Sequence, residues 1–297
     1  MVLIFFYFQI QKIELKDFKQ VKIIHFFPFL SAILLWFLNW FLEYLKWNEM
    51  IYIIQKEVSV KIRLKSFLSG ILTGFLTPNL LGNFIGRMYY FQRRDRQKII
   101  YLTLYSNAAQ FFSSVIFGLC SIIMIGFPIK FKIESNLFMN VALIFSILIC
   151  FVLFFKLHRI FSKLFQEKKW FSKMNVISFG SPKYSEFYFQ FKQMLFSLLR
   201  HFVFSIQYFL ILISFGIRPD FDILFLIWQV FFWSTLVPSL WFGKLFIRES
   251  VALWILASYT HKPEIVLLSS LILWFVNQGV TALIAVPYFK FSTQHNV

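Results

Sequence analysis

Two proline-containing segments hold the residues whose types and spacing best suit the binding of a polar ligand. The first, SGILTGFLTPNLLGNFIGR, covers residues 69–87 and places Pro78 and Asn79 in the middle of an apolar run. The second, VPSLWFGKLFIRE, covers residues 237–249 and has Pro238 near its start. A proline removes a backbone donor and interrupts a helix, so backbone groups freed at membrane depth must face protein, water or a ligand.

The two segments share a spacing that ends in an arginine. Arg87 follows Pro78 by nine positions and Arg248 follows Pro238 by ten, with a glycine between them in each case. A guanidinium can bind a phosphate through two parallel hydrogen bonds. We therefore expect both prolines to mark breaks near one shared cavity, in which Arg87 and Arg248 bind an anionic lipid headgroup. Similar broken segments in two corresponding halves are typical of an inverted repeat with a site at the midplane.

Three other polar residues in or beside apolar runs are candidate lipid-binding residues, namely Glu43, Gln110 and Glu249. An ionisable side chain in lipid is costly, so each is expected to have a partner or a function. Glu43 can pair with Lys46 on one helix face, or both can act as interfacial anchors. Arg248 and Glu249 are neighbours, so on a helix we expect them to point apart. If the acids pair with the arginines instead, the arginines are structural. For Gln110, interhelical hydrogen bonding is the alternative.

Four glycines flank the first proline as two pairs spaced four apart, Gly70 with Gly74 and Gly82 with Gly86. Small residues at this spacing let helix backbones approach closely. Helix packing is favoured over ligand contact for these four residues.

The composition excludes a water-soluble protein. Of 297 residues, 59% are hydrophobic and 14% are charged, whereas a soluble domain carries about 25% charged residues. The formal net charge of +17 is better explained by basic cytoplasmic loops beside anionic lipid than by nucleic-acid binding. The histidines are scattered and the two cysteines lie in apolar runs, so no catalytic constellation, metal site or cofactor site is predicted. We expect the protein not to be an enzyme.

The apolar runs predict an all-α polytopic bundle with six to eight membrane segments, two of them broken by proline or re-entrant. They cover residues 26–45, 66–86, 100–127, 136–155, 194–215, 221–242, 250–260 and 264–287. The predicted organisation is an N-terminal stub and basic linker at 1–25, one transmembrane domain at 26–290, and a tail at 291–297. Residues 1–10 are too short to span, and we interpret them as the end of a first span that is missing.

The distribution of Lys and Arg predicts the topology. Loops 87–98, 128–135, 156–192 and 216–222 carry five, two, eight and one, so the first and third are expected in the cytoplasm. Loop 46–65 also carries five, which places it on the same side as 87–98. Residues 66–86 must then enter the membrane and return, with the turn at Pro78, and 221–242 would do the same from the other side. One conflict stays open, since the Lys-rich stretch before residue 26 would then lie outside.

The stretch 156–173, KLHRIFSKLFQEKKWFSK, has apolar residues at helical spacing and basic residues on the opposite face. This pattern favours a basic helix lying on the cytoplasmic membrane surface. The alternative is a charged run that extends a span.

The ordered motifs NWFLEYLKW, TPNLLGNFIGR, SNAAQ and VPSLWFGKLFIRE resemble those of the lysylphosphatidylglycerol synthase transmembrane family, whose members are flippase-like. The resemblance covers residues 39–287 and implies a multi-pass helical bundle in the bacterial cytoplasmic (inner) membrane. In the best-known members this region is fused to an aminoacyltransferase domain, which we do not expect here because the chain ends at Val297. The family pattern has an acid or glycine where Lys244 stands and a glycine where Phe246 stands. It also has arginine and glutamate where Leu80 and Asn83 stand, which suggests a lost ion pair.

Two functions from different classes agree with these features. The first is a flippase-like protein that binds an anionic membrane lipid or moves it between leaflets. The second is a non-transporting membrane subunit or scaffold that organises a partner lipid-modifying enzyme through loop 156–192.

Overall fold

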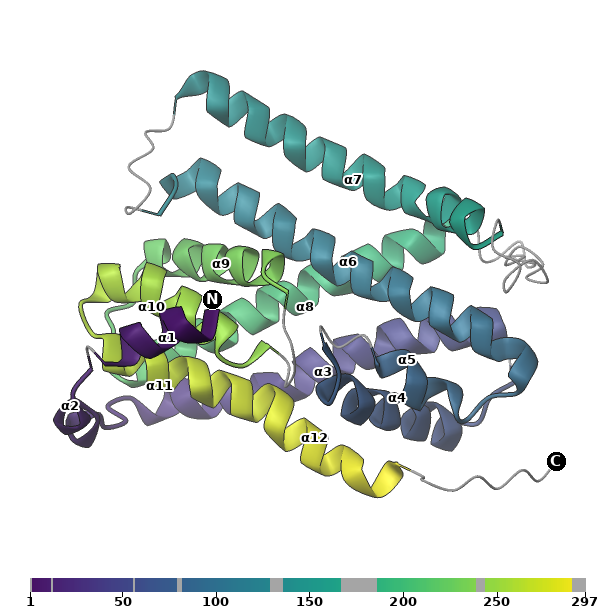
Figure 1. Ribbon diagram of the computed structural model, residues 1–297, viewed down its shortest axis with the longest axis horizontal. Helices are drawn as coiled ribbons and strands as arrows, with labels where there is room; N and C mark the ends of the chain where they lie inside the picture. The colour runs from purple at the N-terminus through teal and green to yellow at the C-terminus, as the bar shows by residue number, and fades with distance from the viewer. Residues whose placement is uncertain are drawn as a thin grey trace.

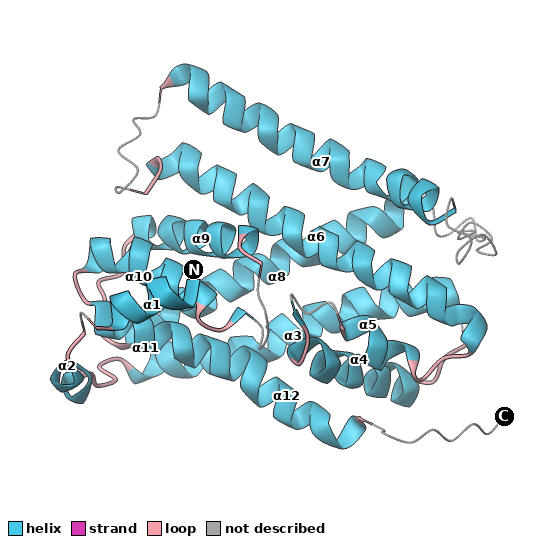
Figure 2. Ribbon diagram, viewed as in Figure 1, coloured by secondary structure: helices cyan, strands magenta, loops and turns pink. Residues whose placement is uncertain are grey.

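The computed structural model describes residues 2–11, 13–55, 57–78, 82–128, 136–166, 186–238 and 244–289. This part of the chain consists of helices and loops (Figure 2), which confirms the predicted all-α bundle. Five of its helices are long and apolar enough to cross a membrane, and they are Phe26–Ile54, Asp95–Ile125, Leu137–Leu157, Glu186–Ser214 and Pro263–Tyr288.

Helices α3 (Phe26–Ile54) and α8 (Glu186–Ser214) are both 29 residues long and pack against each other along their lengths. They run antiparallel: Lys192 at the start of α8 bonds Glu49 near the end of α3, and Gln207 near the end of α8 donates to the Ala32 carbonyl near the start of α3. This pair forms the axis around which the remaining helices are arranged (Figure 1).

Each half of the chain then forms a helical hairpin. The first joins α4 (Val60–Phe75) to α5 (Asn83–Met88), and the second joins α9 (Phe221–Leu236) to α10 (Ile247–Thr260). Both α4 and α9 have 16 residues, or about 24 Å at 1.5 Å per residue, which is less than the roughly 30 Å of a bilayer core. The expectation that 66–86 and 221–242 turn back at their prolines agrees with these hairpins.

A third helix completes each half, and the two halves exchange contacts. Helix α6 (Arg93–Ile125) packs on α9 of the second hairpin. Helix α11 (Pro263–Trp274) continues through a π-helical turn at Phe275–Gly279 into α12 (Val280–Ala285), which packs on α4 of the first hairpin. The order of helix, hairpin and helix in each half, with reciprocal packing, is the arrangement of an inverted repeat.

The hairpins enter from opposite ends of the molecule (Figure 1). The turn between α5 and α6, the end of α7 (Leu137–Gln166) and the start of α8 lie toward the right of the figure, whereas the end of α6, the start of α7 and the turn after α8 lie toward the left. This agrees with the sides predicted by the basic residues, although residues 129–135 and 167–185 lie outside the described residues. Which end faces the cytoplasm stays a prediction.

Helix α7 lies at the edge of the bundle against α6, with long apolar side chains such as Phe145, Ile149 and Val152 exposed. Its backbone continues without a break through residues 156–166. The basic run therefore extends a span there rather than forming a separate surface helix, and residues 167–173 lie outside the described residues. At the N-terminus, α1 (Val2–Ile10) packs on α10, with the Phe6 ring 5.2 Å from the Phe246 ring, and α2 (Leu15–Gln20) leads into α3.

Candidate functional site

A cavity of about 400 Å³ lies where α3, α6 and α8 meet the two hairpins. Its walls include residues near the tips of both hairpins and the π-helical turn after α11. The polar and charged residues that line it are Glu43, Lys46, Asn83, Arg87, Asn107, Gln110, Ser114, Arg200, Thr235, Lys244 and Gln278. The cavity is thus bounded by two hairpins from opposite ends, whose first helices are shorter than a bilayer core.

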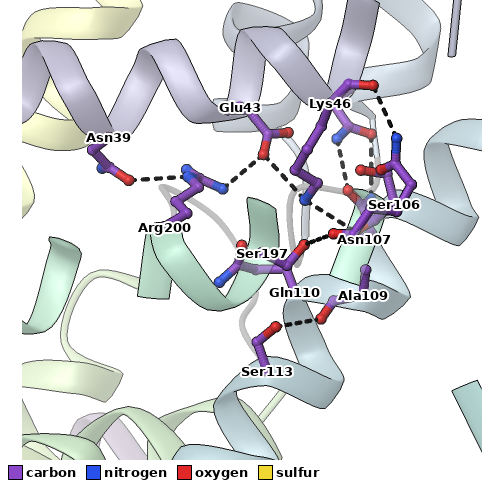
Figure 3. Close-up of polar contacts among 12 residues, drawn as sticks. Asn39, Glu43, Lys46, Ser106, Asn107, Ala109, Gln110, Ser113, Ser197 and Arg200 are labelled. Carbon is purple, nitrogen blue, oxygen red and sulfur yellow. Dashed lines mark hydrogen bonds and ion pairs between the residues drawn. The ribbon is translucent and has the colours of Figure 1, made fainter. Parts of the chain in front are cut away.

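Glu43 is the centre of the charged part of the cavity. Its carboxylate lies 3.3 Å from Lys46 Nζ, 3.5 Å from Arg87 Nη2 and 3.0 Å from Arg200 Nη1. The contacts of Glu43 with Arg200 and Lys46 are drawn in Figure 3. The predicted pairing of Glu43 with Lys46 is therefore present. One carboxylate contacts three cations here, so it neutralises only part of the positive charge around it.

Three elements that are distant in the sequence bring these cations together. Lys46 lies one helical turn after Glu43 on α3, and its ammonium also donates to the Ser106 carbonyl of α6. Arg200 comes from α8, where the antiparallel packing places its Nε and Nη1 against Asn39 and Glu43. Arg87 comes from the short helix α5. The long-range pairing of α3 with α8 sets this geometry, so it could not be read from local sequence.

Aromatic rings hold the guanidinium groups in place. The Arg87 guanidinium lies 4.7 Å from the centre of the Trp47 ring, and that of Arg200 lies 5.3 Å from the Trp40 ring. Cation–π contacts of this kind stabilise a partly desolvated arginine. Trp40 and Trp47 thus pack against the charged cluster.

Glycines permit the close approach of α4 and α5 that positions Arg87. A Cβ added at Gly86 would come within 2.2 Å of the Ser69 carbonyl oxygen, and one added at Gly70 would come within 2.6 Å of Arg87 Cγ. Thr77 fixes the turn between the two helices, because its hydroxyl accepts from the Gly82 amide at 2.7 Å. Gly70 therefore leaves room for the Arg87 side chain to reach the cavity.

Several donors and acceptors near the cavity have no partner among the described residues. The buried Nε and Nη1 of Arg87 meet no hydrogen-bond acceptor there, and Gln110 Oε1 meets no donor. Among the described residues that oxygen therefore makes no interhelical hydrogen bond, which was the alternative predicted for Gln110. Buried polar groups normally have partners, so Arg87 and Gln110 leave hydrogen-bonding groups unsatisfied beside the cavity.

Lys244 supplies the second hairpin's charge to the cavity at a strained backbone position. Its φ angle is 67°, and that of Phe246 is 70°. These left-handed conformations cost a residue with a side chain about 1–2 kcal/mol relative to the right-handed region. The resemblance described above implies an acid or a glycine at Lys244 and a glycine at Phe246. The Lys244 ammonium donates to the Ser234 carbonyl at 3.2 Å, at the C-terminal end of α9.

The second arginine of the predicted pair lies elsewhere. Arg248 Nη2 bonds Glu249 Oε1 and the Ser270 carbonyl, each at 3.0 Å, and Arg248 is not among the described residues that line the cavity. The expectation that Arg248 and Glu249 point apart is wrong: at the start of α10, both turn toward Ser270 of α11, whose hydroxyl donates to Glu249. This pair meets the structural alternative described above. The contact of Arg87 with Glu43 meets it too, but Glu43 also contacts Lys46 and Arg200, whereas the Arg248–Glu249 pair is one-to-one.

The predicted site residues are thus only partly brought together. The described lining residues include Glu43, Arg87, Gln110 and Pro238, as well as Gly70 and Gly74. Pro78 is exposed and is not among them, and Asn79 lies outside the described residues. Sequence reasoning did not assign Arg200, Lys244 or Gln278 to the site. The signal for Arg200 was its place as an ionisable residue within an apolar run.

A buried amide network joins α3, α8 and the π-helical turn beside the cavity. Asn277 accepts from Asn39 at 2.7 Å and donates to Gln207 at 2.9 Å. Its neighbour Gln278 lines the cavity. The π-helical turn thus has the Asn277 amide in the helix packing and the Gln278 amide at the cavity. Irregular turns of this kind frequently occur at functional sites.

Comparison with known proteins gives one match. The family model described as the lysylphosphatidylglycerol synthase TM region matches residues 1–285, nearly the whole chain. No curated protein and no solved structure matches the chain. The family match agrees with the resemblance carried by the four sequence motifs.

Proposed function

Because the chain belongs to the family of the lysylphosphatidylglycerol synthase TM region, a flippase-like family of membrane regions, we propose that it binds an anionic membrane lipid and moves it between leaflets. The headgroup would occupy the cavity around Glu43, while the acyl chains stay in the bilayer.

The observation that supports this proposal is the cation-lined cavity between two hairpins from opposite ends. Lys46, Arg87, Arg200 and Lys244 line it, with Glu43 as the acidic residue among the described lining residues. Buried cations in excess of their acids are costly unless an anion compensates them. A headgroup phosphate supplies that anion, and the planar guanidinium of Arg87 is suited to bind it through two hydrogen bonds.

The inverted arrangement suggests how a headgroup could pass. Each hairpin, whose first helix is shorter than a bilayer core, would separate the cavity from one side of the bundle. Movement of one hairpin relative to α3 and α8 would open the cavity to one leaflet, and movement of the other would open it to the second, as in alternating access between inverted repeats. The sequence carries no ATP-binding motif, so the movement would be passive or driven by a gradient or a partner.

The proposal places the protein in the bacterial cytoplasmic membrane, as a lipid-handling protein rather than an enzyme. The family is the membrane region, which is separate from the aminoacyltransferase domain of its best-known members. A partner enzyme that makes or modifies the lipid would be compatible with this role, whereas the scaffold alternative requires such a partner.

Reconstitution of the purified chain in vesicles tests the proposal. Vesicles containing a fluorescent anionic phospholipid should show bleaching of the inner-leaflet label when a membrane-impermeant reductant is added, above the background of empty vesicles. Arg87→Ala should reduce this activity strongly. Arg248→Ala is the matched control, because it removes a buried arginine from outside the cavity. No translocation by the correctly folded protein would contradict the proposal and favour the scaffold.

A further inference from the structure

The net charge of the cavity indicates how many negative charges its ligand carries. Among the described residues that line the cavity, four are basic and one is acidic. Three of the cations contact the same carboxylate of Glu43 at 3.0–3.5 Å, and one carboxylate can neutralise only one of them. A phosphodiester headgroup with a single negative charge would leave most of this excess uncompensated.

Lys244 indicates that the positive charge itself is needed. Its φ of 67° is a conformation that glycine adopts freely, yet a lysine occupies it and faces the cavity. Backbone strain of this kind is typically retained at binding sites, where the side chain compensates for it. The ammonium, which also donates to the Ser234 carbonyl, brings a cation from the second hairpin to the cavity, in addition to the three that surround Glu43.

We infer that the headgroup bound in this cavity carries two or more negative charges on a phosphomonoester or a diphosphate, rather than the single charge of a phosphodiester. The inference rests on the proposed function and names its substrate class. A phosphomonoester carries about −1.5 to −2 charges at neutral pH. Its terminal oxygens can accept from Arg87, Arg200 and Lys244 without an ester substituent in the way.

Binding measurements on the full chain in neutral detergent test this inference. The probes are short-chain phosphatidate, a phosphomonoester, and short-chain phosphatidylglycerol, a phosphodiester of equal chain length. Phosphatidate should bind on the order of tenfold more tightly. Inorganic pyrophosphate is the third probe, and the inference expects it to bind more weakly than phosphatidate because it has no acyl chains.

Two glycine substitutions isolate the contribution of Lys244. Lys244→Gly removes the ammonium and its hydrogen bond to the Ser234 carbonyl but relieves the strained backbone. These two effects on stability oppose each other, so the melting temperature should stay close to that of wild type while the preference for phosphatidate falls. Phe246→Gly relieves a similar φ of 70° without changing the charge, so it should retain the full preference. A binding defect in Lys244→Gly therefore cannot be attributed to misfolding.

The outcomes separate the two proposals. Equal affinity for phosphatidate and phosphatidylglycerol overturns the inference but leaves the proposed function standing. Binding of neither lipid overturns both. Pyrophosphate that binds as tightly as phosphatidate identifies a free phosphate compound rather than a lipid as the ligand. If Lys244→Gly keeps the wild-type preference for phosphatidate over phosphatidylglycerol, Lys244 does not bind the second negative charge of the headgroup.

Discussion

Replacement of Glu43 by glutamine should destabilise the protein more than any single change at a peripheral ion pair. Glu43→Gln keeps the shape of the side chain but removes the negative charge that three cations share. Lys46 and Arg87 are 1% and 2% exposed at their side chains, so water cannot compensate them. Removal of one partner from a buried ion pair costs about 3–5 kcal/mol, and the repulsion among the remaining cations acts in the same direction.

The matched control is Glu49→Gln on the same helix. Glu49 bonds Lys192 at 2.8 Å, but both side chains are partly exposed, at 17% and 22%. A pair of this kind contributes about 0–1 kcal/mol. With melting temperatures shifting by about 2–4 °C per kcal/mol, Glu43→Gln should melt on the order of 10 °C below wild type, and Glu49→Gln within a few degrees of it.

Thermal unfolding in delipidated detergent, followed by tryptophan fluorescence, measures the difference. The cations remain in Glu43→Gln, so added short-chain phosphatidate should raise the melting temperature of this variant part of the way back toward that of wild type. Phosphatidate should raise the melting temperature of wild type by a smaller amount. If Glu43→Gln melts as high as Glu49→Gln, the three cations are not held by this carboxylate, and the electrostatic reasoning about the cavity is refuted.

Three other predictions concern the hairpin contact, the arginine fork and the topology. Gly86→Ala should destabilise the protein by about 1–3 kcal/mol, since the new methyl would meet the Ser69 carbonyl at 2.2 Å; an unchanged melting temperature would argue against this close contact. Arg87→Lys keeps the charge but loses the planar fork, so a folded, inserted protein should retain less co-purifying lipid by mass spectrometry, and wild-type retention would count against the phosphate contact. A cysteine at Glu57 should be labelled from the cytoplasm and one at Arg218 from outside, and labelling of both from one side would disprove the topology.

The helices and the hairpins could be predicted because their signals are local. A continuous apolar run predicts a membrane helix wherever it occurs, and Pro78 and Pro238 each interrupt such a run. The number of basic residues in successive loops then restricts which runs cross and which return. The hairpin of 66–86 needed both signals, since the proline shows a break and the loop charges show the return.

The site was less predictable because it depends on contacts between distant segments. Arg87 and Arg248 look equivalent in the sequence, yet α3 places Glu43 beside Arg87 together with two other cations, whereas Arg248 finds its acid next to it in the chain. Whether two neighbouring side chains point apart depends on what surrounds the helix, here Ser270 of α11. The strain at Lys244 had a sequence signal, since the resemblance implies an acid or a glycine there, but the signal could be interpreted only once the backbone conformation was known.

Mass spectrometry of the lipids that co-purify with the chain tests the central claim, that the Glu43 cavity binds an anionic headgroup, most directly. Wild type, Arg87→Gln and Arg248→Gln would be purified in parallel and compared at equal amounts of folded protein. An anionic phospholipid should accompany wild type and Arg248→Gln and should be depleted from Arg87→Gln, because of these two arginines only Arg87 lines the cavity. Equal amounts of the same lipid in all three proteins would contradict the claim.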